Sequence, residues 1–220
     1  MTTKPRPGFV VFLAAFAAVL AIALPALAYQ YPLSSTDIRN AYLLGARKDS
    51  VTSDFLNSYR HDLPTPQTGP HVAYILVATP YAQVVDLGQS ALNPDSQQAG
   101  IDLANKEFPF IVRVGVDVTA TYPVPQPANA SSQGELVPDF ANDFKVTLLQ
   151  GGNEINSRSS RVSVLYSPSS LGLNAAQISG AVIELKYDNG DIDPSGKINV
   201  KVQTPDNQKI ETQFDLAPLK

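Results

Sequence analysis

The chain has 220 residues, a net charge of −4, no Cys and no Trp. The acidic balance argues against nucleic-acid binding, for which a basic patch is the usual signature. The absence of Cys excludes cysteine nucleophiles, thiolate metal sites and disulfide bonds. A chain of this length can bury a hydrophobic core without such crosslinks.

The first 28 residues have the three parts of a secretory signal peptide. Lys4 and Arg6 precede an apolar run over residues 9–24, and a small-x-small pattern ends at Ala28. We expect cleavage after Ala28, which would change the net charge to −6 because both cations are removed. The alternative is an uncleaved anchor, but the run is shorter than the roughly 20 residues that span a bilayer. The sequence therefore predicts export to the periplasm or the cell exterior.

Residues 29–63 have helical character. Hydroxyl residues and an acid at positions 34–37 are typical of a helix start. A second short helix is expected over residues 52–59, where apolar side chains fall on one face. These patterns predict a helical hairpin over residues 29–63 that packs on a larger domain, residues 64–220.

A strand is predicted over residues 72–79, which are mostly apolar and β-branched or aromatic. We expect it to continue through residues 81–87 after a break or bulge at Pro80, because proline removes a backbone donor from the sheet. Residues 88–106 are polar and predict irregular structure with one helical turn over residues 97–105.

The clearest strand runs from Phe110 to Tyr122, where apolar and polar residues alternate with a period of two. This alternation predicts a half-buried strand. Similar patterns recur with turn residues between them, over residues 144–149, 161–166, 181–187, 197–203 and 210–216. Six or more short strands predict a mainly β fold, an antiparallel β-sandwich with immunoglobulin-like architecture.

The candidate metal site is an acidic segment containing Asp188, Asp191 and Asp193. Read from Asp191, it gives D-x-D-x-S-G-x-I, which matches the first half of an EF-hand calcium loop. The second half does not match, because Val202 stands where a bidentate acid is expected and Pro194 stiffens the loop. Two interpretations stay open: a calcium site of different geometry, or an acidic turn between two strands. No cofactor is expected, apart from calcium if this segment binds it.

His61 and His71 are the only histidines, and they bracket a proline-rich segment. With Asp62 they have the donor atoms for a zinc ion, but no H-E-x-x-H spacing places two of them on one helix face. The alternative is that both are ordinary polar residues at the ends of a loop.

No catalytic residue is predicted. The chain has no G-x-S-x-G elbow that would expose a nucleophilic serine. Four acids could form an acid–base pair only if the fold brought two of them together. They are Glu107, Asp117, Glu135 and Glu184.

Tyr74 and Tyr81 predict either an aromatic surface or core positions. The leading hypothesis for function is a non-catalytic exported scaffold, adaptor or accessory domain that binds another envelope or secreted protein. Open sheet edges permit such binding by strand addition. Neither nucleic acid nor membrane is an expected partner, apart from an uncleaved signal segment. A calcium- or carbohydrate-binding module and a secreted hydrolase are the alternatives.

Overall fold

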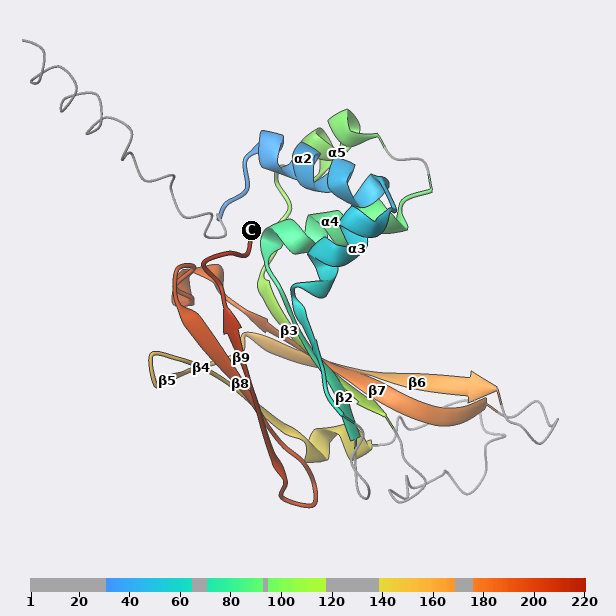
Figure 1. Ribbon diagram of the computed structural model, residues 1–220, viewed down its shortest axis with the longest axis vertical. Helices are drawn as coiled ribbons and strands as arrows, with labels where there is room; N and C mark the ends of the chain where they lie inside the picture. Colours follow the sequence, from blue (N-terminus) through green and yellow to red (C-terminus); the bar gives the residue numbers. More distant parts are fainter. Residues whose placement is uncertain (1–30, 65–70, 93–94, 118–138, 169–175) are drawn as a thin grey trace, which may run out of the picture.

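The computed structural model describes residues 31–64, 71–92, 95–117, 139–168 and 176–220. The fold is mainly β, with two antiparallel sheets and a group of helices at one end (Figure 1). The expected signal peptide, the end of the strand predicted to reach Tyr122, and Glu135 lie outside the described residues.

The larger sheet, sheet A, has five antiparallel strands in the order β1-β2-β3-β7-β6. Their bounds are β1 Arg60–Asp62, β2 His71–Ala78, β3 Phe110–Asp117, β7 Ala176–Tyr187 and β6 Ser159–Pro168. In its middle, Val114 pairs with Ile75 on one side and Ile183 on the other. Because β6 is last in this order, it forms one edge of sheet A in the described part of the chain.

The smaller sheet, sheet B, has four antiparallel strands in the order β5-β4-β8-β9. Their bounds are β5 Asn153–Ile155, β4 Lys145–Gln150, β8 Lys197–Gln203 and β9 Lys209–Asp215. Gly151 and Gly152 join β4 to β5 with φ values of 57° and 87°, the left-handed conformation that a two-residue hairpin turn needs. A hairpin turn therefore follows β4, at a point where the sequence indicates turn residues.

One cluster of buried hydrophobic side chains contains members from both sheets. Val112 and Val114 of β3, like Leu148 of β4 and Val200 of β8, have no exposed surface. The face of sheet A that carries these residues is called its core face, and the opposite one its second face. Since both sheets contribute to this cluster, their apolar faces are buried together.

Strand β3 is confirmed, but the prediction that it is half-buried is wrong. On its second face Ile111 is 5% exposed, and Gly115 is also buried. A Cβ added at Gly115 would lie 2.1 Å from the ring of Tyr74, so this ring lies directly over the glycine. Side chains from neighbouring strands therefore cover the face that alternation alone assigns to solvent.

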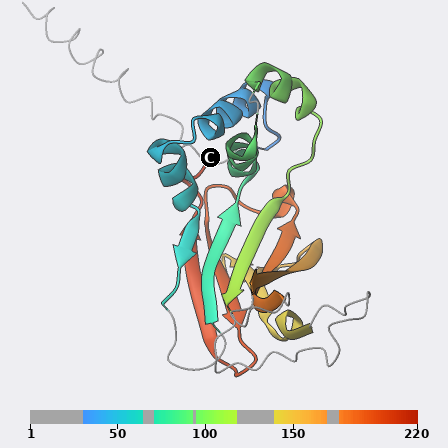
Figure 2. The same cartoon turned by 90° about the vertical axis from the view of Figure 1, so that its right-hand side faces the viewer.

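Four helices form a layer at the end of sheet A where β2 ends and β3 begins (Figures 1 and 2). They are α2 Ser35–Ala46, α3 Ser50–Asn57, α4 Pro80–Ser90 and α5 Ser96–Asp102. The predicted start of α2 is confirmed: Ser34 and Asp37 form a capping box, in which each side chain bonds the other's backbone N–H. The helical turn predicted near residue 97 is part of α5.

The prediction of a strand over residues 81–87 is wrong, because this segment belongs to α4. Thr79 caps the helix by accepting a hydrogen bond from the backbone N–H of Ala82 at 3.3 Å. Pro80 occupies the first turn of α4, where its missing N–H costs nothing. Val84 and Val85 are fully buried against α2, so the apolar residues here follow helical rather than strand spacing.

Three residues connect the helical layer to the end of the sequence. The Tyr59 hydroxyl donates to the Lys220 carbonyl oxygen at 2.9 Å and accepts from the Lys220 backbone N–H at 3.0 Å. The Thr79 hydroxyl donates to the same carbonyl. Burial raises the pKa of Tyr59 to about 12, so this phenol stays a neutral donor over the physiological pH range.

Candidate functional site

The three aspartates of the predicted calcium loop have separate surroundings. An Asp188 carboxylate oxygen lies 3.3 Å from Arg158 Nη1, and Asp191 is exposed in the short 3₁₀ turn Asn189–Asp191. Asp193 accepts from the Ser195 hydroxyl at 2.7 Å and its backbone N–H at 2.9 Å, and both bonds lower the pKa of Asp193. Among the described residues, no three His, Asp or Glu side chains are grouped closely enough to hold a metal ion.

Side-chain packing and amide hydrogen bonds hold the same turn in place. The Gln150 amide donates to the Asp193 carbonyl oxygen and accepts from the Asp193 backbone N–H, each at 2.8 Å. Ile192 is 4% exposed and belongs to the core cluster. Asn189 Nδ2 donates to the carbonyl oxygen of Phe108 at 2.8 Å. The calcium loop stays a prediction, and these contacts favour the alternative of an acidic turn.

Calcium should not raise the melting temperature if the segment is only a turn. The test compares thermal unfolding in excess chelator with unfolding in about 5 mM calcium, above the ~10⁻³ M dissociation constants of weak extracellular calcium modules. A ligand that binds only the folded state must raise the unfolding free energy. A rise that Asp188→Asn abolishes, while magnesium has no effect, would establish a calcium site instead.

The two histidines lie on opposite faces of sheet A. The His61 ring contacts Phe214 of sheet B edge-on, with ring centroids 4.6 Å apart, on the core face. His71 lies on the second face, with its Nδ1 3.7 Å from a carboxylate oxygen of Asp117. The fold therefore does not bring together the zinc ligands that the sequence suggests, His61, His71 and Asp62.

The His71–Asp117 pair has two of the three groups of a hydrolytic triad. His71 is 7% exposed and its Nε2 is buried without a hydrogen-bond partner. Catalysis of this kind needs a hydroxyl nucleophile bonded to that nitrogen. No hydroxyl of the described residues occupies that position, so the pair assigns no reaction.

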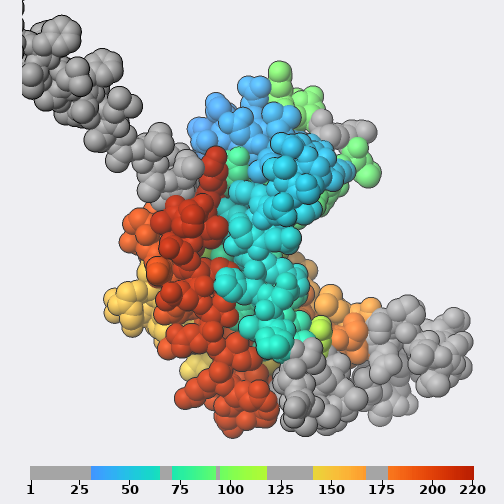
Figure 3. All heavy atoms as spheres, in the orientation of Figure 1, coloured from blue at the N-terminus to red at the C-terminus, as the bar shows by residue number. Residues whose placement is uncertain are grey.

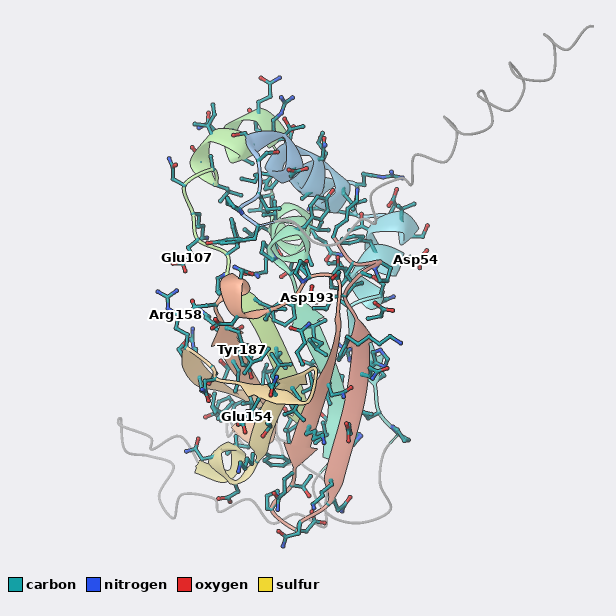
Figure 4. The ribbon with its side chains drawn as sticks, turned by 90° about the vertical axis from the view of Figure 1, so that its left-hand side faces the viewer. Asp54, Glu107, Glu154, Arg158, Tyr187 and Asp193 are labelled. Carbon is teal, nitrogen blue, oxygen red and sulfur yellow. The ribbon has the colours of Figure 1, made fainter. Side chains whose placement is uncertain are left out.

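Two of the other candidate acids are taken up by ion pairs. Glu107 accepts from Arg158 at 2.5 Å, and the two side chains lie side by side between the helical layer and the sheets (Figure 4). Glu184 accepts from Arg113 Nε at 2.7 Å. These acids come from different parts of the fold and form no acid–base pair.

Of the two tyrosines that the sequence singles out, Tyr74 lies at the surface and Tyr81 lies in the core. Tyr74 lies on the second face of sheet A, where the Arg60 guanidinium stacks 3.8 Å from its ring centroid. Tyr81 is 9% exposed within the helical layer and contacts Phe55 edge-on, with ring centroids 5.8 Å apart. They do not form a common aromatic surface.

The candidate functional site is the free edge of β6. In the described part of the chain, β6 pairs with β7 alone, and its ten residues contain a single charged side chain, Arg161. Natural edge strands are usually short or carry several charges, which discourages pairing with other chains. The edges β1 and β5 have three residues each, and β9 carries Lys209, Glu211 and Asp215. Among the described residues, strand β6 has neither of these two protections; its register shift at Leu165 and Tyr166 and its final residue, Pro168, both lie toward its C-terminal end. The strand reaches the surface below the helical layer (Figure 3).

Apolar side chains line both faces of β6. Val162 and Val164 are partly buried against the core cluster, so they lie on the core face. Leu165 and Tyr166 are 43% and 48% exposed, on either side of a register shift against β7. The sequence predicts this strand over residues 161–166, but it contains no signal that β6 ends a sheet.

The described residues define a mainly β protein with two antiparallel sheets, a helical layer and one long, weakly charged edge strand. No protein-family model matches the chain, and no curated protein matches it. A crystal structure of a protein of unknown function from Burkholderia pseudomallei K96243 is similar over 87% of this chain and 96% of that one, with a TM-score of 0.32 and 7% identity. No helix among the described residues is long and apolar enough to cross a membrane.

Proposed function

We propose that this chain is an exported, non-catalytic adaptor or scaffold protein that binds a partner protein by strand addition at β6. The observation that carries this proposal is the ten-residue edge with one charge and two exposed apolar side chains, Leu165 and Tyr166. A partner's extended segment would use the unpaired backbone groups of this edge and cover those side chains.

Strand addition suits the chemistry of β6. Alternate residues of an edge strand direct their backbone N–H and C=O groups away from the sheet, where an incoming strand can bond them. Favourable cross-strand side-chain pairs add roughly 0.2–1 kcal/mol each. Because the strand is ten residues long, several such pairs can act together.

The immunoglobulin-like type of the fold and the export of the protein are part of the same proposal. Two antiparallel sheets around one core support a β-sandwich of immunoglobulin-like type, with α4 and α5 inserted between β2 and β3. The signal-like residues 1–28 support export and a partner in the cell envelope or among secreted proteins.

A photo-crosslinking amino acid at Ser163 of β6 should capture the partner in the cells that produce this protein. Ser163 is exposed near the middle of the edge strand. The matched control is Gln213, an exposed residue of the charged edge strand β9. The measurement is the yield of crosslinked adduct on a denaturing gel, which should be high at Ser163 and near background at Gln213.

Lysine at an exposed apolar position of the edge should reduce that yield, because charged edges resist strand pairing. Leu165→Lys tests this, and Leu92→Lys is its control, since Leu92 is 94% exposed between α4 and α5. Equal adduct yields at Ser163 and Gln213, or no adduct at either, would contradict the proposal.

A further inference from the structure

Arg161 of β6 forms no ion pair with a carboxylate among the described residues. It is exposed and pairs in register with Glu184 of β7, on the second face of sheet A. Glu184 is already engaged, however, by Arg113 Nε at 2.7 Å and by Lys186 Nζ at 3.7 Å. Arg161 has no ion pair with any carboxylate in the described part of the chain. An unneutralised cation therefore lies next to the open edge.

The charge of the surrounding row is also positive. Five residues align across the sheet on its second face, one from each strand: Arg60, Leu76, Arg113, Glu184 and Arg161. Asp62 pairs with Arg60 at 2.7 Å, which leaves the β6 end of the row with more cations than anions. This is a local exception in a chain whose net charge is −4.

The core face of β6 has the opposite character. Val162 and Val164 pair in register with Ile183 and Ala181, and all four lie on the apolar side of the sheet. A strand added beside β6 would alternate in the same way, because successive side chains point to opposite faces. One of its faces would meet valines and the other would meet Arg161.

We infer that the partner segment is an extended strand with apolar side chains on one face and an acidic side chain, Asp or Glu, opposite Arg161 on the other. The inference rests on the proposed function and specifies its partner. A second copy of β6 does not fit this position, because Ser159–Pro168 contains no Asp or Glu. Opposite charges facing each other across two strands stabilise the pairing, whereas an unmatched or like charge does not.

The test measures crosslinking at Ser163 in full-length protein with Arg161→Gln and with Arg161→Lys. Arg161→Gln should lower the adduct yield about 1.4- to 5-fold, the range expected for losing one cross-strand ion pair. Arg161→Lys keeps the charge and should retain most of the yield. Lys209→Gln, which removes a cation from the other long edge strand, is the matched control and should have no effect. Thermal unfolding of each variant checks that folding is intact.

Mass spectrometry of the adduct then identifies the captured segment. An alternating segment with Asp or Glu within a few residues of the crosslink, captured less by Arg161→Gln, supports the inference. Three results overturn the inference and leave strand addition standing. They are an equal adduct yield in wild type and Arg161→Gln, a captured segment without Asp or Glu, and a captured segment that comes from a second copy of β6. Failure of Ser163 to capture anything above the Gln213 background overturns the proposed function and this inference together.

Discussion

Gly45→Ala should lower the free energy of unfolding by about 3 kcal/mol, the upper end of the range for overpacked cores. A Cβ added at Gly45 of α2 would lie 2.0 Å from the carbonyl oxygen of Val85 in α4. The contact is reciprocal, since a Cβ at Gly88 of α4 would lie 2.4 Å from the carbonyl oxygen of Tyr42. Two helix backbones therefore touch, and only a shift of a whole helix could make room.

The measurement is chemical or thermal unfolding. For a domain of this size, about 3 kcal/mol corresponds to a fall of roughly 6–12 °C in melting temperature. Gly100→Ala in α5 is the matched control, because its added Cβ would meet the Arg39 side chain, with Cγ at 2.6 Å, and would come no closer to a backbone atom than 3.4 Å, to the Ser35 carbonyl oxygen. Replacing Gly by Ala raises helix propensity in both variants, so Gly100→Ala should be as stable as wild type or slightly more stable. If Gly45→Ala is equally harmless, the helices do not cross in backbone contact.

Ile192→Ala should lower the free energy of unfolding by about 2–5 kcal/mol, the range for truncating a buried aliphatic side chain. Ile192 lies in the middle of the acidic turn and is 4% exposed within the core cluster. The loss combines the transfer free energy of the removed carbon atoms with the cost of the cavity left in the core cluster. Urea unfolding with an unchanged m-value would assign the effect to the native state.

The neighbouring aspartate is the matched control. Asp191→Asn changes the charge of an exposed side chain and should change the unfolding free energy by no more than about 0.5 kcal/mol. This pair of variants separates a turn held by packing from a loop that works through its carboxylates. A cost for Asp191→Asn comparable with that of Ile192→Ala would contradict the packing explanation.

Local sequence rules succeeded where the next few residues decide the structure. The capping box at Ser34 and Asp37 and the glycine turn at Gly151 both depend on backbone groups within three residues. Pattern reading failed at α4, because adjacent β-branched valines and an interior proline resemble an interrupted strand. A local signal was available, however, since Thr79 before Pro80 is the usual cap and first residue of a helix.

The candidate site depended on information that no local pattern contains. Alternation identifies β6 as a strand, but the same alternation would fit the centre or the edge of a sheet. Whether Arg161 has a counter-charge depends on which side chains reach Glu184, and Arg113, one of the two, is far away in sequence. The two histidines likewise lie on opposite faces only because of the register between strands.

The sequence by itself therefore determined the secondary structure of most segments, the mainly β class and the absence of disulfides, since these follow from composition and short-range periodicity. The tertiary structure alone decided the order of strands, the burial of Ile192, the contact between two helix backbones and the open edge at β6. These features depend on which distant segments come into contact. The burial of both sheets in one core decides those contacts, and the secondary-structure propensity of a single segment does not.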